Sequence, residues 1–160
     1  MDSQKTISVL VNDQPGVMNR VTSLFTRRGF NMESITVGAS EEVGVSRITI
    51  VTSGDDRLIN QILNQLLKLI DVYEATLLTP QETVRRELAF MKMRVDPSKN
   101  DEIVGIVKRF EANVVDIGTK EMIIQAVGDT ERINTIVEQL TPYGMYQLSR
   151  TGVMAMEKGR

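Results

Sequence analysis

The chain repeats part of itself. The segment GDDRLINQILNQL (residues 54–66) and the segment GDTERINTIVEQL (128–140) share Gly-Asp, Ile-Asn, Ile and Gln-Leu at the same spacings, 74 residues apart. A second pair, NMESI (31–35) and NVVDI (113–117), is 82 residues apart. The different offsets predict a shorter hairpin in the second copy, which lacks about eight residues of the loop GASEEVGVS that begins at Gly38. Because the chain has only 160 residues, the repeat indicates two similar small folding units.

The spacing of apolar residues in the first copy predicts strands in some segments and helices in others. Residues 6–11 alternate apolar and polar side chains, which is typical of a strand. Apolar residues from Val17 to Phe25 recur on one helical face, and Gly29 is expected to end that helix after Pro15 has opened it. The remaining predicted elements are strands at 30–37 and 45–51, a helix with its apolar face running from Leu58 to Ile70, and a strand at 71–78.

The sequence of the second copy predicts the same order of strands and helices, after a Pro-containing linker at 79–83. Its predicted elements are strands at 84–95, 113–118, 121–127 and 145–156, with helices at 103–110 and 130–140. The order β-α-β-β-α-β, found twice, predicts an α+β fold of two tandem ferredoxin-like domains, 1–79 and 80–160. Each domain is small and leaves sheet edges open, which favours pairing within or between chains.

Missing residue types restrict the chemistry of the chain. It contains no His, Cys or Trp, which excludes His bases, Cys nucleophiles and His/Cys zinc sites. No phosphate-binding loop or dinucleotide-binding glycine motif is present. A net charge of −2 and 4% aromatic residues argue against nucleic acid as a partner. We predict no catalytic residue, no metal site and no membrane span, and the missing Cys suggests a cytoplasmic protein.

The turn NDQPGV (12–17) is the strongest candidate for a binding site. A strand entering a helix leaves backbone N–H groups free at the positive end of the helix dipole, which suits a carboxylate. Asp13 offers an acceptor for a ligand ammonium group, Gly16 permits close approach to the backbone, and Asn31 can donate and accept. A plain structural turn explains Pro15 and Gly16 equally well, and spacing alone favours that interpretation.

The residues resemble those of a known family, the regulatory small subunits of acetohydroxyacid synthase, also called acetolactate synthase. Residues 8–37, SVLVNDQPGVMNRVTSLFTRRGFNMESITV, are similar to the opening of that family. Residues 28–37 resemble the pattern R-G-[FY]-N-I-x-S-[IL]-T-V, with Met32 in place of the Ile. Further matching blocks are VSRITI (45–50), KLIDV (68–72), VRRELAFMKM (84–93) and RTGVMAM (150–156).

The resemblance implies an N-terminal ACT domain, which binds an effector and forms dimers, and a related C-terminal domain. It implies that two ACT domains join edge to edge, with valine or another branched-chain amino acid bound between the chains as feedback inhibitor. The chain would be non-catalytic and would activate a catalytic large subunit that holds thiamine diphosphate, magnesium and FAD. The implied effector-binding residues are Asp13, Gln14, Pro15, Gly16, Val17, Met18, Asn31, Met32 and Ile35.

One departure from the family pattern falls within that site. Family members commonly carry Asn where this chain has Asp13, so the amide donor is lost and a negative charge is added near the expected carboxylate.

Two other functions stay open. One is a free-standing ACT-type amino-acid sensor that acts on another partner. The other is a small acylphosphatase-like enzyme, for which Arg20 and Asn31 are the loosely placed anion-binding candidates.

Overall fold

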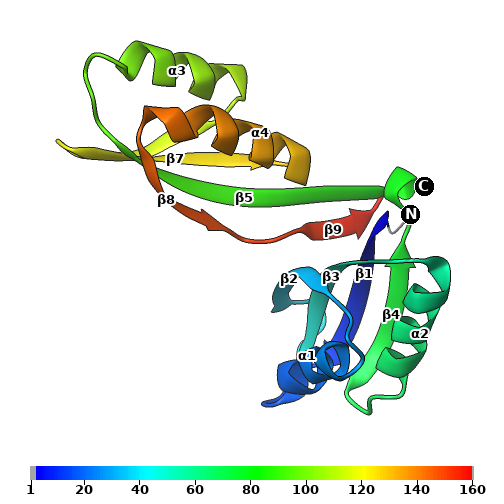
Figure 1. Ribbon diagram of the computed structural model, residues 1–160. Helices are drawn as coiled ribbons and strands as arrows, with labels where there is room; N and C mark the ends of the chain where they lie inside the picture. Colours follow the sequence, from blue (N-terminus) through cyan, green and yellow to red (C-terminus); the bar gives the residue numbers. More distant parts are fainter. Residues whose placement is uncertain (1–2, 160) are drawn as a thin grey trace. The chain divides into compact units, whose positions relative to one another are not determined.

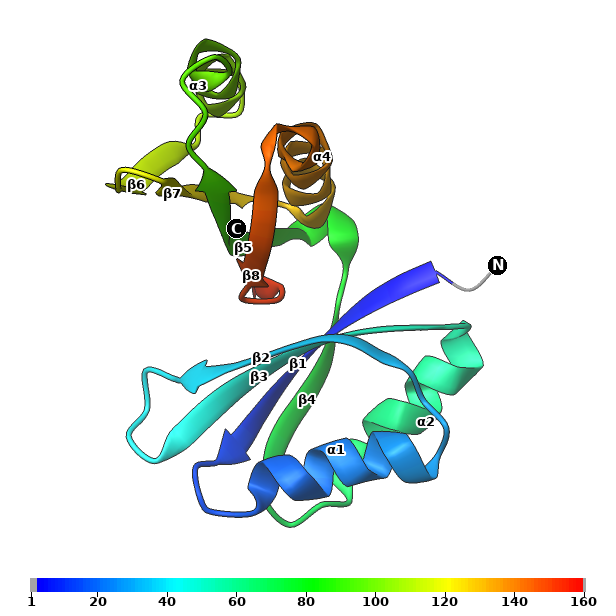
Figure 2. The ribbon, with the colours of Figure 1, turned by 60° about the vertical axis from the view of Figure 1, so that its left-hand side comes forward.

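In the computed structural model, which describes residues 3–159, the first copy of the repeat forms an antiparallel sheet with two helices on one face (Figures 1 and 2). The strand order is β2-β3-β1-β4, so β2 and β4 are the edge strands. Its elements are β1 (Ser3–Asn12), α1 (Val17–Arg27), β2 (Met32–Ala39), β3 (Val45–Gly54), α2 (Asp56–Leu67) and β4 (Val72–Leu78).

The alternating pattern of β1 positions the core of this unit. Ile7 and Val9 are fully buried beneath the helices and pair with Ile50 and Ile48 of β3, which are also fully buried. Phe25 of α1 packs into the same core. Burying these large apolar side chains supplies most of the favourable free energy that a unit of this size can gain.

The second copy forms a sheet of order β6-β7-β5-β8, with β9 also paired to β5. Its helices α3 and α4 again lie on one face (Figure 1). The elements are β5 (Thr83–Arg94), α3 (Asn100–Arg109), β6 (Asn113–Ile117), β7 (Glu121–Gly128), α4 (Thr130–Leu140), β8 (Met145–Arg150) and β9 (Met154–Glu157). Short 3-10 turns lie at Pro80–Glu82 and Thr141–Tyr143. The predicted α+β fold of two ferredoxin-like domains is therefore confirmed.

The hairpin of the second copy is shorter, as the offsets predict. Strands β6 and β7 have 5 and 8 residues, against 8 and 10 in β2 and β3. Most of the difference therefore lies in the strands rather than in the connecting loop. In the same sheet, Met91 and Met93 are fully buried opposite Ile124 and Met122, so these methionines are core residues.

Several predicted ends differ from the structure by a few residues, and two differences change the fold locally. The helix expected to reach Ile70 ends at Leu67, and Ile70 is 92% exposed in the turn that follows. The single strand expected at 145–156 is broken into β8 and β9, because Gly152 adopts a left-handed conformation with φ of 86°.

Close contacts group the residues up to Val84 with the segment from Val153 on, and Arg85–Gly152 form the other unit. The final segment is grouped with the first unit, and the Val153 N–H donates to the Ser34 hydroxyl of that unit at 2.9 Å. Val153 and Ala155 are buried. The domain division at residues 79 and 80 stays a prediction. Among residues 3–159, no helix combines the length and the apolar character needed to cross a membrane.

Candidate functional site

The loop between β1 and α1 turns sharply at Gly16. This residue precedes the helix with φ of 88°, a left-handed conformation that glycine adopts without the steric cost borne by other residues. Helix α1 therefore begins at Val17, and Pro15 lies in the turn before it. The expectation that Pro15 opens the helix is wrong by two positions, because Gly16 completes the turn first.

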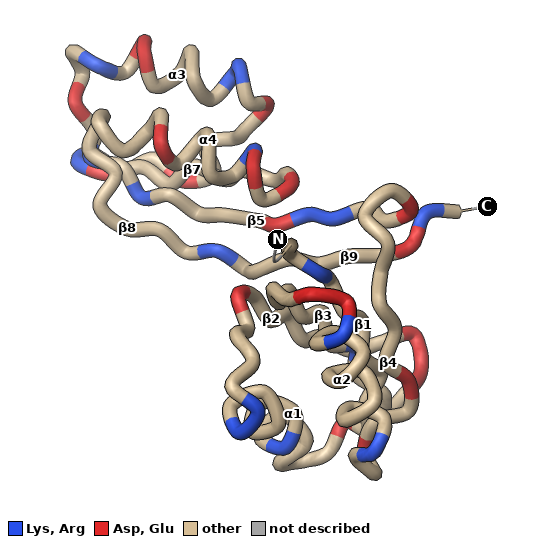
Figure 3. The backbone as a smooth tube through the Cα atoms, turned by 45° about the vertical axis from the view of Figure 1, so that its right-hand side comes forward, with Lys and Arg blue, Asp and Glu red and all other residues tan. Residues whose placement is uncertain are grey.

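Within the described residues, the first turn of α1 has no side-chain cap and no acidic residue. In contrast, Asp55 and Asp129 cap α2 and α4, each accepting a backbone N–H at 2.8 Å. Along its length, α1 carries basic but no acidic residues (Figure 3). Its uncapped N–H groups and the positive end of its dipole therefore suit an anionic group such as a carboxylate.

Neighbouring backbone holds the loop in place on two sides. The Asn12 N–H donates to the Asp71 carbonyl at 2.8 Å, and the Asp13 N–H donates to the Gly44 carbonyl at 2.9 Å. Asp13, Gln14, Pro15 and Gly16 are all exposed. These four predicted site residues are thus gathered on one fixed, accessible loop, next to the β2–β3 connection.

The predicted apolar residues have different environments. Val17 is 2% exposed and belongs to the core, and its N–H donates to the Gln14 carbonyl at 3.3 Å, so it is not accessible to a ligand in this structure. Met18, Met32 and Ile35 are half-buried and pack against that core, with one side of each left accessible. Such side chains can form the apolar wall against which an aliphatic ligand rests.

Asn31 does not lie at the loop of its own chain. It is exposed and directly precedes β2, beyond the end of α1, and its carbonyl accepts a hydrogen bond from the Thr52 hydroxyl. The 11 residues of α1 separate it from Gly16, about 16 Å at 1.5 Å per residue. Figure 2 shows the start of α1 and the start of β2 at opposite ends of the helix. Within one chain, the predicted site is therefore divided in two.

Sequence reasoning missed Asp71 beside the loop, and it named Arg20 only as a loosely placed anion-binding candidate, without its partner. The Arg20 Nε donates to the Asp71 Oδ2 at 2.7 Å, although the residues are 51 positions apart. Neither periodicity nor any local motif indicates a pair at that separation. The match of KLIDV (68–72) to a family block was the only signal that included Asp71.

A hollow lies on the helix-free face of the same unit. This cavity of about 430 Å³ lies between β1, β3, β4 and β9. The Arg47 Nη1 donates to the Ser8 hydroxyl at 2.8 Å in its floor, and Glu74 and Glu157 border it. Across residues 3–159, no three acidic side chains gather in a way that could hold a metal ion.

Shifted pKa values occur in the second unit and have local causes. The hydrogen bond from Tyr146 lowers the pKa of Glu121, and the same bond raises the pKa of the Tyr146 hydroxyl. Hydrogen bonds from Ser98 lower the pKa of Asp96 in the turn before α3. Tyr146 is exposed, and Asp96 and Glu121 are half-buried. Each shift is explained by its immediate neighbours, so the shifts do not identify an acid–base site.

Comparison with known proteins covers nearly the whole chain. Residues 7–74 match the family described as AHAS small subunit-like ACT domain, and residues 86–159 match the family described as small subunit of acetolactate synthase. The chain is 45% identical over 154 residues to a probable acetolactate synthase small subunit of Methanothermobacter thermautotrophicus, covering 96% of this chain and 92% of that one. It is 42% identical over 157 residues to the acetolactate synthase small subunit of Bacillus subtilis, covering 98% and 91%.

A solved structure agrees with these matches. The crystal structure of the acetolactate synthase small subunit from Thermotoga maritima is 37% identical and superposes with a TM-score of 0.94, covering 99% of each chain. The match covers both halves of the chain. The chain belongs to the family of acetolactate synthase small subunits.

Proposed function

We propose that this chain is the regulatory subunit that binds the catalytic large subunit of acetolactate synthase, raises its activity and makes it sensitive to valine or another branched-chain amino acid. Membership of the small-subunit family supports a catalytic large subunit as the partner. The uncapped start of α1 supports the effector, because it offers N–H groups and positive potential to the carboxylate that every free amino acid carries.

The effector site is completed by a second copy of the chain. Strand β2 is an edge of its sheet, so its outer backbone groups can pair with another strand. Antiparallel pairing of two β2 strands reverses one of them and brings the Asn31 end of one strand to the Ala39 end of the other. The Ala39 end lies next to the loop, since Gly44 accepts the Asp13 N–H. The division of the predicted site within one chain is the observation that carries this proposal.

In this account the large subunit performs the catalysis and holds thiamine diphosphate, magnesium and FAD. The effector acts by linkage: it binds one state of the two-subunit complex more tightly than another, and it shifts the equilibrium by that difference. Coupling between sites in proteins is typically about 1–3 kcal/mol, a change in affinity of about 5–150-fold. Valine is therefore expected to lower activity strongly without entering the catalytic site.

Reconstitution tests the proposal. Catalytic large subunit from the same source is assayed for acetolactate formation alone, with this chain, and with this chain plus valine. We expect the chain to raise the rate and valine to lower it again, with no effect of valine on the large subunit alone. Absence of any complex or activation would contradict the proposal. Valine binding without such a complex would instead favour a free-standing amino-acid sensor.

A further inference from the structure

Arg20 of α1 is held by a carboxylate that is largely shielded from solvent. Its Nε donates to the Asp71 Oδ2 at 2.7 Å, and its Nη2 contacts the same oxygen. The Asp71 side chain is 14% exposed, whereas the Arg20 side chain is 47% exposed. Because the acceptor is shielded, salt and water weaken this pair less than they weaken a fully exposed pair.

Asp71 binds the loop a second time through its backbone. Its carbonyl accepts the Asn12 N–H at 2.8 Å, at the residue where β1 ends and the loop begins. The turn that contains Asp71 is itself fixed, because the Val72 N–H donates to the Leu69 carbonyl at 3.1 Å. One residue therefore anchors the entrance of the loop by its main chain and the following helix by its side chain.

The guanidinium group of Arg20 also lies against Gly16. A Cβ atom added to Gly16 would be 3.1 Å from the Arg20 Nη1, closer than ordinary van der Waals contact. Since Nε and Nη2 face Asp71, Nη1 is the nitrogen that lies beside the glycine. The positive charge is thus fixed at the uncapped helix start, where the dipole is also positive.

On the basis of the proposed function, we infer that Arg20 is a positioning residue of the effector site. Held by Asp71, it fixes the Gly16 turn and the first N–H groups of α1 in the geometry that receives the effector carboxylate. Its charge adds to the potential that favours that carboxylate. Asp71 acts through Arg20, so the two residues are expected to affect effector binding as one unit.

The test is valine binding to the full-length chain, measured by isothermal titration calorimetry. We expect Arg20→Gln to weaken binding roughly tenfold, as the loss of one charge-assisted interaction predicts. Arg20→Lys should recover part of the affinity, because Lys keeps the charge but cannot reproduce the fork of nitrogens. Asp71→Asn should also weaken binding, but it should add little once Arg20 is already Gln.

A matched control is available in the same unit. Lys5 and Asp56 form an ion pair at 3.7 Å with an exposed carboxylate, so Lys5→Gln should leave valine binding unchanged. Thermal unfolding of each variant without valine identifies any that do not fold, and Arg20→Lys and Asp71→Asn are the mildest changes of shape. A general loss of stability does not predict that the losses of valine affinity in the Arg20 and Asp71 variants are non-additive.

The results separate this inference from the proposed function. Wild-type chain that binds neither valine, leucine nor isoleucine would overturn the proposed function and this role of Arg20 with it. Tight wild-type binding that is unchanged in Arg20→Gln, or additive losses in the double variant, would overturn the role of Arg20 alone.

Discussion

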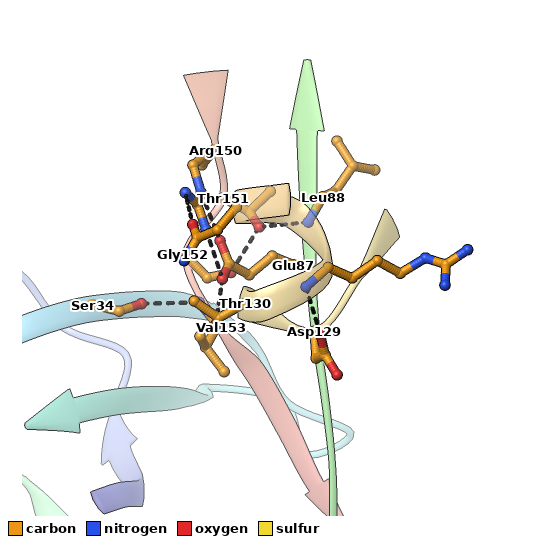
Figure 4. Close-up of polar contacts among 11 residues, drawn as sticks. Ser34, Glu87, Leu88, Asp129, Thr130, Arg150, Thr151, Gly152 and Val153 are labelled. Carbon is orange, nitrogen blue, oxygen red and sulfur yellow. Dashed lines mark hydrogen bonds and ion pairs between the residues drawn. The ribbon is translucent and has the colours of Figure 1, made fainter. Parts of the chain in front are cut away.

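Glu87 illustrates how single residues stabilise the second unit. This carboxylate is 5% exposed, yet each of its oxygens is satisfied. The Arg150 Nε donates to one oxygen at 2.9 Å, while the Arg150 Nη2 and the Thr130 hydroxyl donate to the other at 3.1 and 2.5 Å. Figure 4 shows Arg150 and Thr130 pointing toward Glu87. A buried charge is tolerated only when it is paired and hydrogen-bonded in this way.

Replacing only Arg150 should lower the free energy of unfolding more than replacing both Arg150 and Glu87. We expect Arg150→Met to lower the free energy of unfolding by about 3 kcal/mol, since it leaves Glu87 buried without its cation. Adding Glu87→Leu should restore part of the loss. Urea unfolding followed by circular dichroism measures both changes. Lys92→Met, at the exposed pair with Glu121, is the control and should cost less than about 1 kcal/mol. An equal loss in Arg150→Met and the control would contradict this account.

At the residue scale, the sequence identifies positions whose identity is set by local geometry. Gly16 is one, because a sharp turn before a helix needs a residue free to adopt positive φ. Arg20 is not, because its role depends on Asp71, which only the folded chain brings close. The roles of Asp13 and Asn31 in effector binding stay predictions.

At the scale of elements, periodicity predicts the strands and helices well and their ends poorly. The apolar face of α2 is correct through Leu66, which is fully buried. The pattern continues to Ile70, but the chain has already turned, since the Leu69 N–H donates to the Leu66 carbonyl. A residue that fits the periodicity beyond the last helical turn is indistinguishable from a helical one by sequence alone.

The segment around β9 could not be assigned from sequence either. It reads as the continuation of β8, and only its contacts reveal that it belongs with the first unit. Val153 and Ala155 are buried there, while Met154 and Met156 point outward and are exposed. This alternation is the ordinary pattern of a strand with one covered face.

Truncation gives a test of this assignment. We expect a fragment that ends at Val84 to fold, but to be less stable than the same fragment joined by a flexible linker to residues 153–159. The expected difference is about 2 kcal/mol, the contribution of burying one valine side chain. Thermal unfolding of the two fragments measures it. Equal stability, or a stabilising effect that persists when both Val153 and Ala155 are replaced by Ser, would contradict the assignment.

At the scale of the whole molecule, the internal repeat predicts the architecture, and the matching sequence blocks indicate the family. Both follow from patterns that lie within the chain: matched spacings for the two folds, and sequence blocks along nearly its full length. The effector site is harder to predict because it depends on two copies of the chain. One copy holds the loop and Asn31 at opposite ends of α1. The pairing of the two copies is therefore the central claim to test.

Mixed dimers test that claim most directly. One chain carries Gly16→Asp, which places a carboxylate where that of the effector should lie, and the other carries Asn31→Ala. Differently tagged chains are co-expressed, the mixed dimer is purified by both tags, and valine binding is measured by calorimetry. If each site combines the loop of one chain with Asn31 of the other, both variant homodimers bind weakly and the mixed dimer holds one intact site. A mixed dimer that binds no better than the homodimers would contradict the shared site.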